Sequence, residues 1–174
     1  TVNARHKKSK NRWKRIVLWF LVILFLILAG VFIFLKVIAR KGLPDYNADI
    51  KLNGLTAPVK VIRDASGTPH IYAENESDLY LAVGYVMAQE RMWQMDLLRR
   101  ITQGRLSEIL GKKMAETDLL MRALRIQEKS EKIIAGASPE IILALEVFSE
   151  GVNEYIRYYP LPPEFKILGY NPEP

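Results

Sequence analysis

An uninterrupted apolar stretch near the start of the chain limits its structure more than any other feature. Residues Ile16 to Leu35 are twenty consecutive positions without a charged side chain. At a rise of about 1.5 Å per residue, a helix of this length spans the roughly 30 Å hydrocarbon core of a bilayer. The sequence therefore predicts a transmembrane signal-anchor helix over residues 16–35, with the lipid bilayer as its partner.

Basic residues are distributed unevenly around this stretch. Seven Lys or Arg precede it and three follow it, at positions 36, 40 and 41. Because the more basic flank stays on the cytoplasmic side, residues 1–15 are predicted to form a basic cytoplasmic tail and the chain after the helix to be extracytoplasmic. A cleaved secretory signal is the alternative, since Val37-Ile38-Ala39 resembles a signal-peptidase site. The apolar region of such a signal is normally about 7 to 15 residues long.

The net charge of +6 belongs entirely to this first segment. Residues 1–41 hold ten basic and no acidic side chains, whereas the remainder holds fifteen basic and nineteen acidic ones. A basic nucleic-acid-binding domain is therefore excluded, and no nucleic acid is expected as a partner. The sequence has no cysteine and two histidines, which excludes a disulfide framework, a thiolate metal site and a multi-histidine metal site within it.

After a linker predicted over residues 36–56, the chain shows a hairpin pattern. Val59 to Asp64 alternates apolar and polar side chains, Ser66-Gly67 supplies a turn, and Pro69 to Ala73 resumes in extended character. Within the linker, a short strand is expected over Ala48 to Leu52. Residues 57–174 are predicted to form one incomplete α+β domain.

A long helix is predicted after the hairpin, beginning at Asn75. Leu79 to Ala88 carries no charge, so this part is expected to be buried on every side, more fully than the neighbouring segments of this chain can achieve. Gly84 within it indicates that another backbone passes close by. Further along, Asp96 has the spacing to pair with Arg99 or Arg100.

Further helices are predicted in the second half of the domain. Arg105 to Leu110 is expected to form one short helix and Glu116 to Ile134 a longer one. Ser138-Pro139-Glu140 marks another helix start, with apolar side chains at helical spacing from Ile141 to Tyr159 and Glu154 among the polar positions between them. Proline at position 160 ends that helix.

Three motifs follow one another between residues 63 and 111. They are Arg63-Asp64-x-x-Gly67-x-Pro69-His70-Ile71-x-Ala73, Gly84-Tyr85-Val86-x-Ala88-Gln89-Glu90-Arg91-x-x-Gln94-Met95, and Arg99-Arg100-x-x-x-Gly104-x-Leu106-x-Glu108-x-x-Gly111. In this order they resemble the start of the α subunit of the penicillin acylase family, whose members are N-terminal nucleophile amidohydrolases. The resemblance covers roughly Leu43 to Pro174, and Glu90 stands where many relatives have Asp.

The resemblance implies an αββα fold that downstream sequence completes, with a β-subunit segment of the same precursor as partner. It implies autoproteolysis that frees a nucleophile, normally serine, and hydrolysis of an acylated amine such as a penicillin or an acyl-homoserine lactone. Calcium is expected only in the complete enzyme. The family's pocket residues and its α-subunit calcium ligand lie beyond the matched motifs, so no catalytic, substrate-binding or metal residue is assigned here. The alternative is a non-catalytic membrane-tethered binding or scaffold module that keeps the fold.

A few residues could carry chemistry on their own. His70 fits a hydrogen-bonded structural role better than a catalytic one. Arg99 and Arg100 could grip a carboxylate, although a structural ion pair accounts for them more simply. Four large side chains of the long helix could either line an apolar acyl pocket or simply fill the core: Met87, Met92, Trp93 and Met95.

Overall fold

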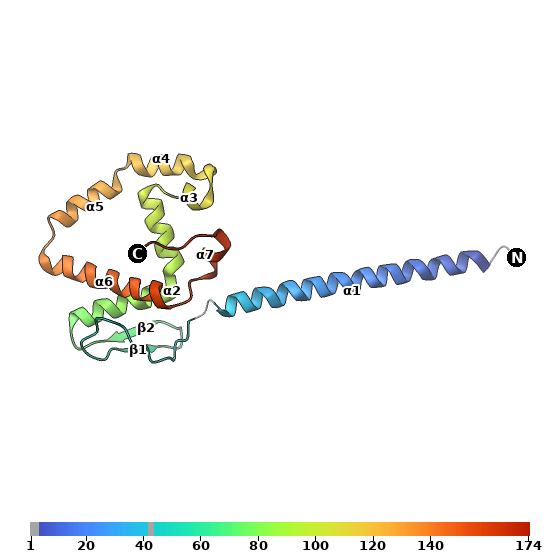
Figure 1. The fold of residues 1–174 in the computed structure, drawn as a ribbon, viewed down its shortest axis with the longest axis horizontal. Helices are drawn as coiled ribbons and strands as arrows, with labels where there is room; N and C mark the ends of the chain where they lie inside the picture. Colours follow the sequence, from blue (N-terminus) through green and yellow to red (C-terminus); the bar gives the residue numbers. More distant parts are fainter. Residues whose placement is uncertain (1–3, 42–43) are drawn as a thin grey trace. The chain divides into compact units, whose positions relative to one another are not determined.

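The computed structural model describes residues 4–41 and 44–174, and contacts divide the chain into two units, residues 1–43 and 44–174. In the first unit, α1 (Ala4–Lys41) is a single helix (Figure 1). Its stretch Arg12–Val37 is long and apolar enough to cross a membrane, a test that a signal sequence also passes. The helix includes residues 36–41, which were expected in the linker, whereas Gly42 and Leu43 lie outside the described residues.

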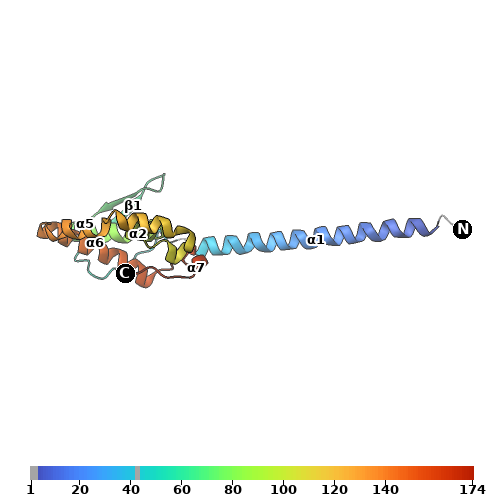
Figure 2. The ribbon, with the colours of Figure 1, turned by 90° about the horizontal axis from the view of Figure 1, so that it is seen from above.

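The second unit begins with the predicted hairpin, which is confirmed. Strands β1 (Lys60–Arg63) and β2 (Pro69–Tyr72) pair antiparallel. The Asp64 carboxylate closes the turn by accepting from the backbone N–H groups of Ser66 and Thr68 at 2.8 and 2.9 Å. Figure 2 shows this hairpin extending from one side of the helices.

The long helix α2 (Glu76–Gln103) starts where the sequence indicates. The side chain of Asn75 accepts from the backbone N–H of Asp78 at 2.8 Å, which satisfies a free donor of the first turn. The helix ends at Gly104, whose left-handed backbone (φ +64°) terminates it. Arg91 (φ −137°, ψ 21°) departs from helical geometry and introduces a kink.

Helix α6 (Pro139–Tyr158) packs along α2 at very short range. A Cβ atom at Gly84 would stand 2.0 Å from the carbonyl oxygen of Phe148, and a Cβ atom at Gly151 would stand 2.0 Å from that of Leu81. These distances are far below van der Waals contact, so the two glycines are what lets the backbones touch. The close approach expected at Gly84 is confirmed.

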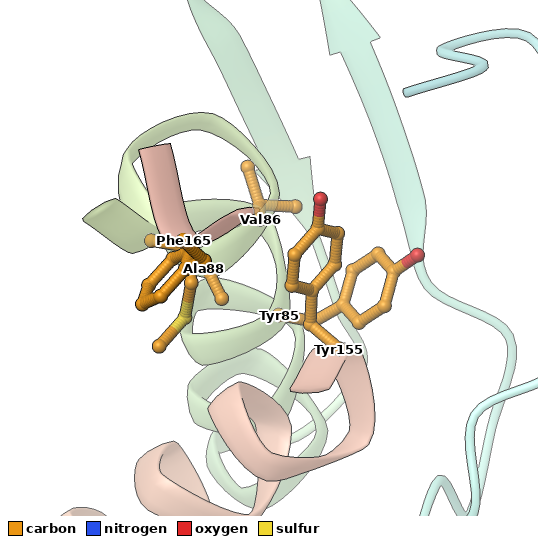
Figure 3. Close-up of a cluster of buried hydrophobic side chains, with 6 residues drawn as sticks. Tyr85, Val86, Ala88, Tyr155 and Phe165 are labelled. Atoms are coloured by element: carbon orange, nitrogen blue, oxygen red, sulfur yellow. The ribbon is translucent and has the colours of Figure 1, made fainter. Parts of the chain in front are cut away.

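A cluster of buried side chains lies where α2, α6 and α7 (Pro163–Leu168) meet (Figure 3). The rings of Tyr85 and Tyr155 pack edge to face, with their centroids 5.8 Å apart. The buried members of the cluster are Tyr85, Val86, Ala88, Met92, Tyr155 and Phe165. Tyr80 and Met87 of α2 stay 38% and 41% exposed, so the described elements cover α2 incompletely, as the sequence predicts.

The region after α2 differs from the prediction of one long helix over Glu116 to Ile134. Arg125 has a left-handed backbone (φ 53°), which breaks that stretch into two helices. The sequence showed no sign of this break, since arginine is a good helix former. The elements in order are α3 (Ser107–Leu110), the 3₁₀-helix η1 (Lys112–Met114), α4 (Ala115–Ala123) and α5 (Ile126–Ala135).

Helix α6 begins at Pro139 as expected, but the face that it buries differs from the predicted apolar stripe. Ile141 and Leu145 are 53% and 44% exposed, and the buried residues of α6 are instead Gly151, Glu154 and Tyr155. Glu154, expected among the polar positions, is 1% exposed. Its carboxylate accepts from the backbone and side-chain N–H groups of Asn53, at 3.3 and 3.1 Å.

No strand forms over Ala48 to Leu52, so that expectation is wrong. The stretch is irregular, and Ile50 and Leu52 pack against the buried cluster instead. Further along this segment, Asp78 anchors Thr56 and Ala57, because its carboxylate accepts from their backbone N–H groups at 2.8 and 2.9 Å. Buried carboxylates therefore hold this segment on the helices at two points, Asp78 and Glu154.

These hydrogen bonds predict acid sensitivity. The backbone hydrogen bond from Thr56 is the main cause that lowers the pKa of Asp78 from the usual 3.8 to about 2. A carboxyl whose pKa is lower in the folded state stabilises the fold fully above its unfolded value, and this contribution is lost as the pH falls. We expect unfolding stability to decrease between about pH 4 and pH 2. The decrease should be shallower in the Asp78→Asn variant when both are followed by denaturant titration at several pH values.

Candidate functional site

A buried carboxylate organises the C-terminal half of α2. Asp96 accepts from Arg100 Nε at 2.9 Å, from Arg99 at 3.1 Å and from the Tyr170 hydroxyl at 2.8 Å. The side chain of Asp96 is fully buried and that of Arg100 is 5% exposed. The ion pair expected from the spacing is confirmed, whereas Tyr170 lies 74 positions away and no local signal indicated it.

The network continues to the last residues of the chain. Arg105 pairs with Glu108 at 2.9 Å and with Glu173 at 2.7 Å. The hydrogen bond from Arg105 lowers the pKa of Glu173 to about 2. Arg99 donates to the main-chain oxygen of Glu173 at 2.8 Å. Arg99 and Arg100 are therefore engaged in structural pairs, which favours that interpretation over a grip on a substrate carboxylate.

His70 lies in β2, close to the turn of the hairpin. Its side chain is half-exposed, and its Nε2 stands 3.5 Å from Oδ2 of Asp64, the carboxylate that closes the turn. These contacts fit a structural histidine.

The four large side chains of α2 differ in their burial. Met92 is 3% exposed and belongs to the buried cluster, whereas Met87 is 41% exposed. The indole of Trp93 packs against the rings of Phe165 and Tyr170, with centroids 5.6 and 6.2 Å apart. This placement favours core filling for Met92 and Trp93.

A cavity of about 560 Å³ lies between the segment 45–63 and α2. Its size falls within the range of ligand pockets. Apolar side chains such as Ile50, Val61 and Val86 form much of the wall, while Tyr85, Gln89 and Arg63 are among its polar residues. None of the lining residues is a Ser, Thr, Cys or His, so the wall of this cavity can bind and orient a group but lacks the aliphatic hydroxyl and thiol nucleophiles.

Arg63 is one of four charged residues that line this cavity, with Asp45, Asp49 and Lys60, and the sequence alone did not indicate its place there. Its guanidinium stacks over the Tyr46 ring, 4.1 Å from the centroid. One terminal nitrogen donates to Gln89 Oε1 at 2.9 Å and to Glu90 Oε1 at 3.0 Å. Arg63, Gln89 and Glu90 all belong to the first two sequence motifs, and their place in these motifs was the sign of the pairing in the sequence. Nothing in the sequence indicated the stacking on Tyr46.

The sequence model of the family described as penicillin amidase matches residues 58–174, which include the cavity wall on α2, the buried cluster and the Asp96 network. The chain belongs to the penicillin amidase family. This confirms the family that the three motifs indicate.

Relatives within the penicillin amidase family include two named hydrolases. The penicillin acylase 2 proenzyme of Pseudomonas sp. (strain SE83) is 41% identical over 136 residues, which cover 78% of this chain and 18% of that protein. The acyl-homoserine lactone acylase QuiP of Pseudomonas fluorescens is 38% identical over 133 residues, covering 75% of this chain and 16% of that protein. The chain thus spans less than a fifth of the length of these curated relatives.

The fold is also similar to a solved structure from this family. A thermostable penicillin G acylase from Alcaligenes faecalis matches with a TM-score of 0.61 and 31% identity. The match covers 67% of this chain and 65% of that chain. The helix-rich arrangement with one two-stranded sheet is therefore a family arrangement.

Proposed function

We propose that this chain is the N-terminal portion of an amidohydrolase precursor that cleaves the amide bond of an acylated amine. The observation that carries the proposal is the family match over residues 58–174, together with relatives named as penicillin acylase and acyl-homoserine lactone acylase. A substrate of this class joins an acyl group to an amine through a linear amide. The partner is the β-subunit segment of the same precursor, which would complete an αββα sandwich.

The proposed mechanism uses a nucleophile from the downstream segment. Autoproteolysis would free the α-amino group of a Ser, Thr or Cys, and this amine would take the proton of its own hydroxyl or thiol. Attack on the amide carbonyl gives an oxyanion that hydrogen-bond donors stabilise. The C–N bond then breaks, the amine leaves with a proton, and water hydrolyses the acyl-enzyme to the carboxylic acid.

The family resemblance allows calcium in the complete enzyme, with one ligand from the α subunit that lies beyond the matched motifs. Among residues 4–41 and 44–174, no three His, Asp or Glu side chains gather as a cation site. No step of the proposed mechanism passes through a metal.

Activity tests the proposal directly. The complete precursor should release carboxylic acid from a panel of N-acyl amines. Replacing the new N-terminal residue of its β subunit by alanine should reduce that rate by at least about a thousandfold, because the nucleophile and its base are one residue. The His70→Ala variant is the control, and its rate should stay near that of the parent. An intact precursor that binds but hydrolyses none of these amides would instead support the scaffold alternative.

We also propose that α1 anchors the protein as a single-pass signal-anchor helix, with the N-terminus cytoplasmic and residues 44–174 extracytoplasmic. Its apolar length and the seven preceding basic residues support this orientation. Protease added to intact protoplasts should digest the domain and spare the basic tail. Protection of the domain would contradict the orientation, and a mature N-terminus at Arg40 would show that the helix is a cleaved signal.

A further inference from the structure

A shallow groove runs along one face of α1, at the start of its apolar stretch. It has a volume of about 320 Å³ and is lined by Trp13, Lys14, Val17, Leu18 and Leu21. Positions 14, 17, 18 and 21 follow the i, i+3, i+4, i+7 pattern of one helix face. The groove therefore joins a polar end, Trp13 and Lys14, to an apolar floor of three aliphatic side chains.

In the proposed membrane orientation, the polar end of this groove lies at the depth of the lipid headgroups. The uncharged stretch begins at Ile16. The Cα atoms of Trp13 and Lys14 therefore stand about 3 to 5 Å outside the hydrocarbon core, at about 1.5 Å per residue. The headgroup layer on each side of a bilayer is roughly 5 to 7 Å thick. Lys14 is thus level with the lipid phosphates, whereas the apolar floor lies at the depth of the acyl chains.

The two side chains at the polar end suit a phosphate group. The Lys14 ammonium is a point charge of the kind that binds phosphates, and the Trp13 indole supplies an N–H donor from a ring type that is enriched at membrane interfaces. Both side chains are exposed, Trp13 by 71%. Residues 1–41 include no acidic side chain, so none of them can neutralise Lys14.

The charge around the groove favours anionic over zwitterionic lipids. Residues 1–15 carry seven basic side chains and no acidic one. A zwitterionic headgroup brings its own ammonium group into this positive field, whereas an anionic headgroup such as phosphatidylglycerol does not. Clusters of about four to eight basic residues beside a transmembrane helix attract anionic lipids for the same reason.

We propose that this groove binds one anionic phospholipid of the cytoplasmic leaflet, with the phosphate at Lys14 and Trp13 and an acyl chain along the apolar floor. The inference rests on the proposed anchoring by α1, because only a membrane helix brings the groove to this depth. It adds to the anchor a lipid site of defined position and charge.

Fluorescence quenching by brominated lipids tests the site in the complete protein, reconstituted in phosphatidylcholine vesicles. Trp19→Phe removes the second tryptophan of α1, and subtracting the signal of a variant with both Trp13→Phe and Trp19→Phe isolates the emission of Trp13. At the same small mole fraction, dibrominated phosphatidylglycerol should quench Trp13 at least about twice as strongly as dibrominated phosphatidylcholine, because the basic surroundings concentrate the anionic lipid. Equal quenching by the two lipids would overturn the site and leave the anchor intact.

Lys14→Gln and Arg15→Gln form a matched pair, because each removes one positive charge and only position 14 lines the groove. Lys14→Gln should remove most of the preference for the anionic lipid, and Arg15→Gln should keep most of it. Equal losses in the two variants would show a diffuse attraction by charge and overturn the site. Quenching by neither lipid, or a mature N-terminus at Arg40, would overturn the anchor and the site together. Amide hydrolysis, measured on the unmodified protein, judges the proposed enzyme separately.

Discussion

Replacing Gly84 by alanine should lower the free energy of unfolding of the complete protein by at least about 3 kcal/mol. The new Cβ would stand 2.0 Å from the carbonyl oxygen and 2.9 Å from the carbonyl carbon of Phe148. Backbone atoms of a helix cannot rotate away as a side chain does, so α2 and α6 would have to separate and open gaps along their contact. The gain in helix propensity from alanine, about 1 kcal/mol, is too small to compensate.

Gly136→Ala is the control for this experiment. Its nearest neighbours would lie 3.8 Å or more from an added Cβ, and its φ of −104° suits any residue. We expect a change within about 1 kcal/mol in either direction. Equilibrium unfolding in urea, followed by circular dichroism, measures both variants. A Gly84→Ala protein as stable as the Gly136→Ala protein would show that the helices do not touch through their backbones.

Replacing Asp96 by alanine should cost about 3 to 5 kcal/mol, because it leaves a buried positive charge without its partner. Arg100 is 4% exposed overall and would keep its stacking on the Tyr170 ring and its bond to Glu108, whose side chain is nearly half exposed. The Tyr170 hydroxyl would lose its acceptor as well, which loosens the chain after α7.

Glu128→Ala supplies the contrast. Glu128 also pairs with two cations, Arg125 and Lys132, but these side chains are 67% and 73% exposed. Solvent-exposed pairs contribute about 0 to 1 kcal/mol, so this variant should melt close to the parent. Thermal unfolding monitored by calorimetry compares the two. Equal losses of stability in the two variants would mean that burial does not strengthen the contribution of the Asp96 ion pairs.

Interactions between near neighbours in sequence were predicted well from residues alone. The hairpin, the cap at Asn75 and the pair between Asp96 and Arg100 all join groups no more than twelve positions apart, where spacing and turn length fix the geometry. Gly84 indicated that another backbone segment passes close to α2, but it did not indicate that this segment is α6. A glycine shows that a side chain would not fit at its position, and it does not identify the segment that occupies the space.

The features that were missed depend on distant partners. Glu154 is buried because Asn53, 101 positions away, donates to it, and helical periodicity could not reveal such a partner. Arg125 breaks a helix although its side chain favours one, so helix propensity alone could not predict the break. The cavity likewise joins the segment 45–63 to α2, and it forms only when both walls are in place.

The contact between Gly84 and Phe148 also sets an order of events during synthesis. The apolar part of α2 is complete at Ala88, yet α6 ends at Tyr158, 70 positions later. At about 5 to 20 residues per second, the ribosome needs roughly 4 to 14 s to produce that stretch. During this interval the apolar part of α2 lacks its partner helix α6 and is open to chaperones or to aggregation, whichever side of a membrane it occupies. Slower translation after residue 88 would prolong this exposure, and the yield of folded protein should therefore depend on codon usage between positions 89 and 158.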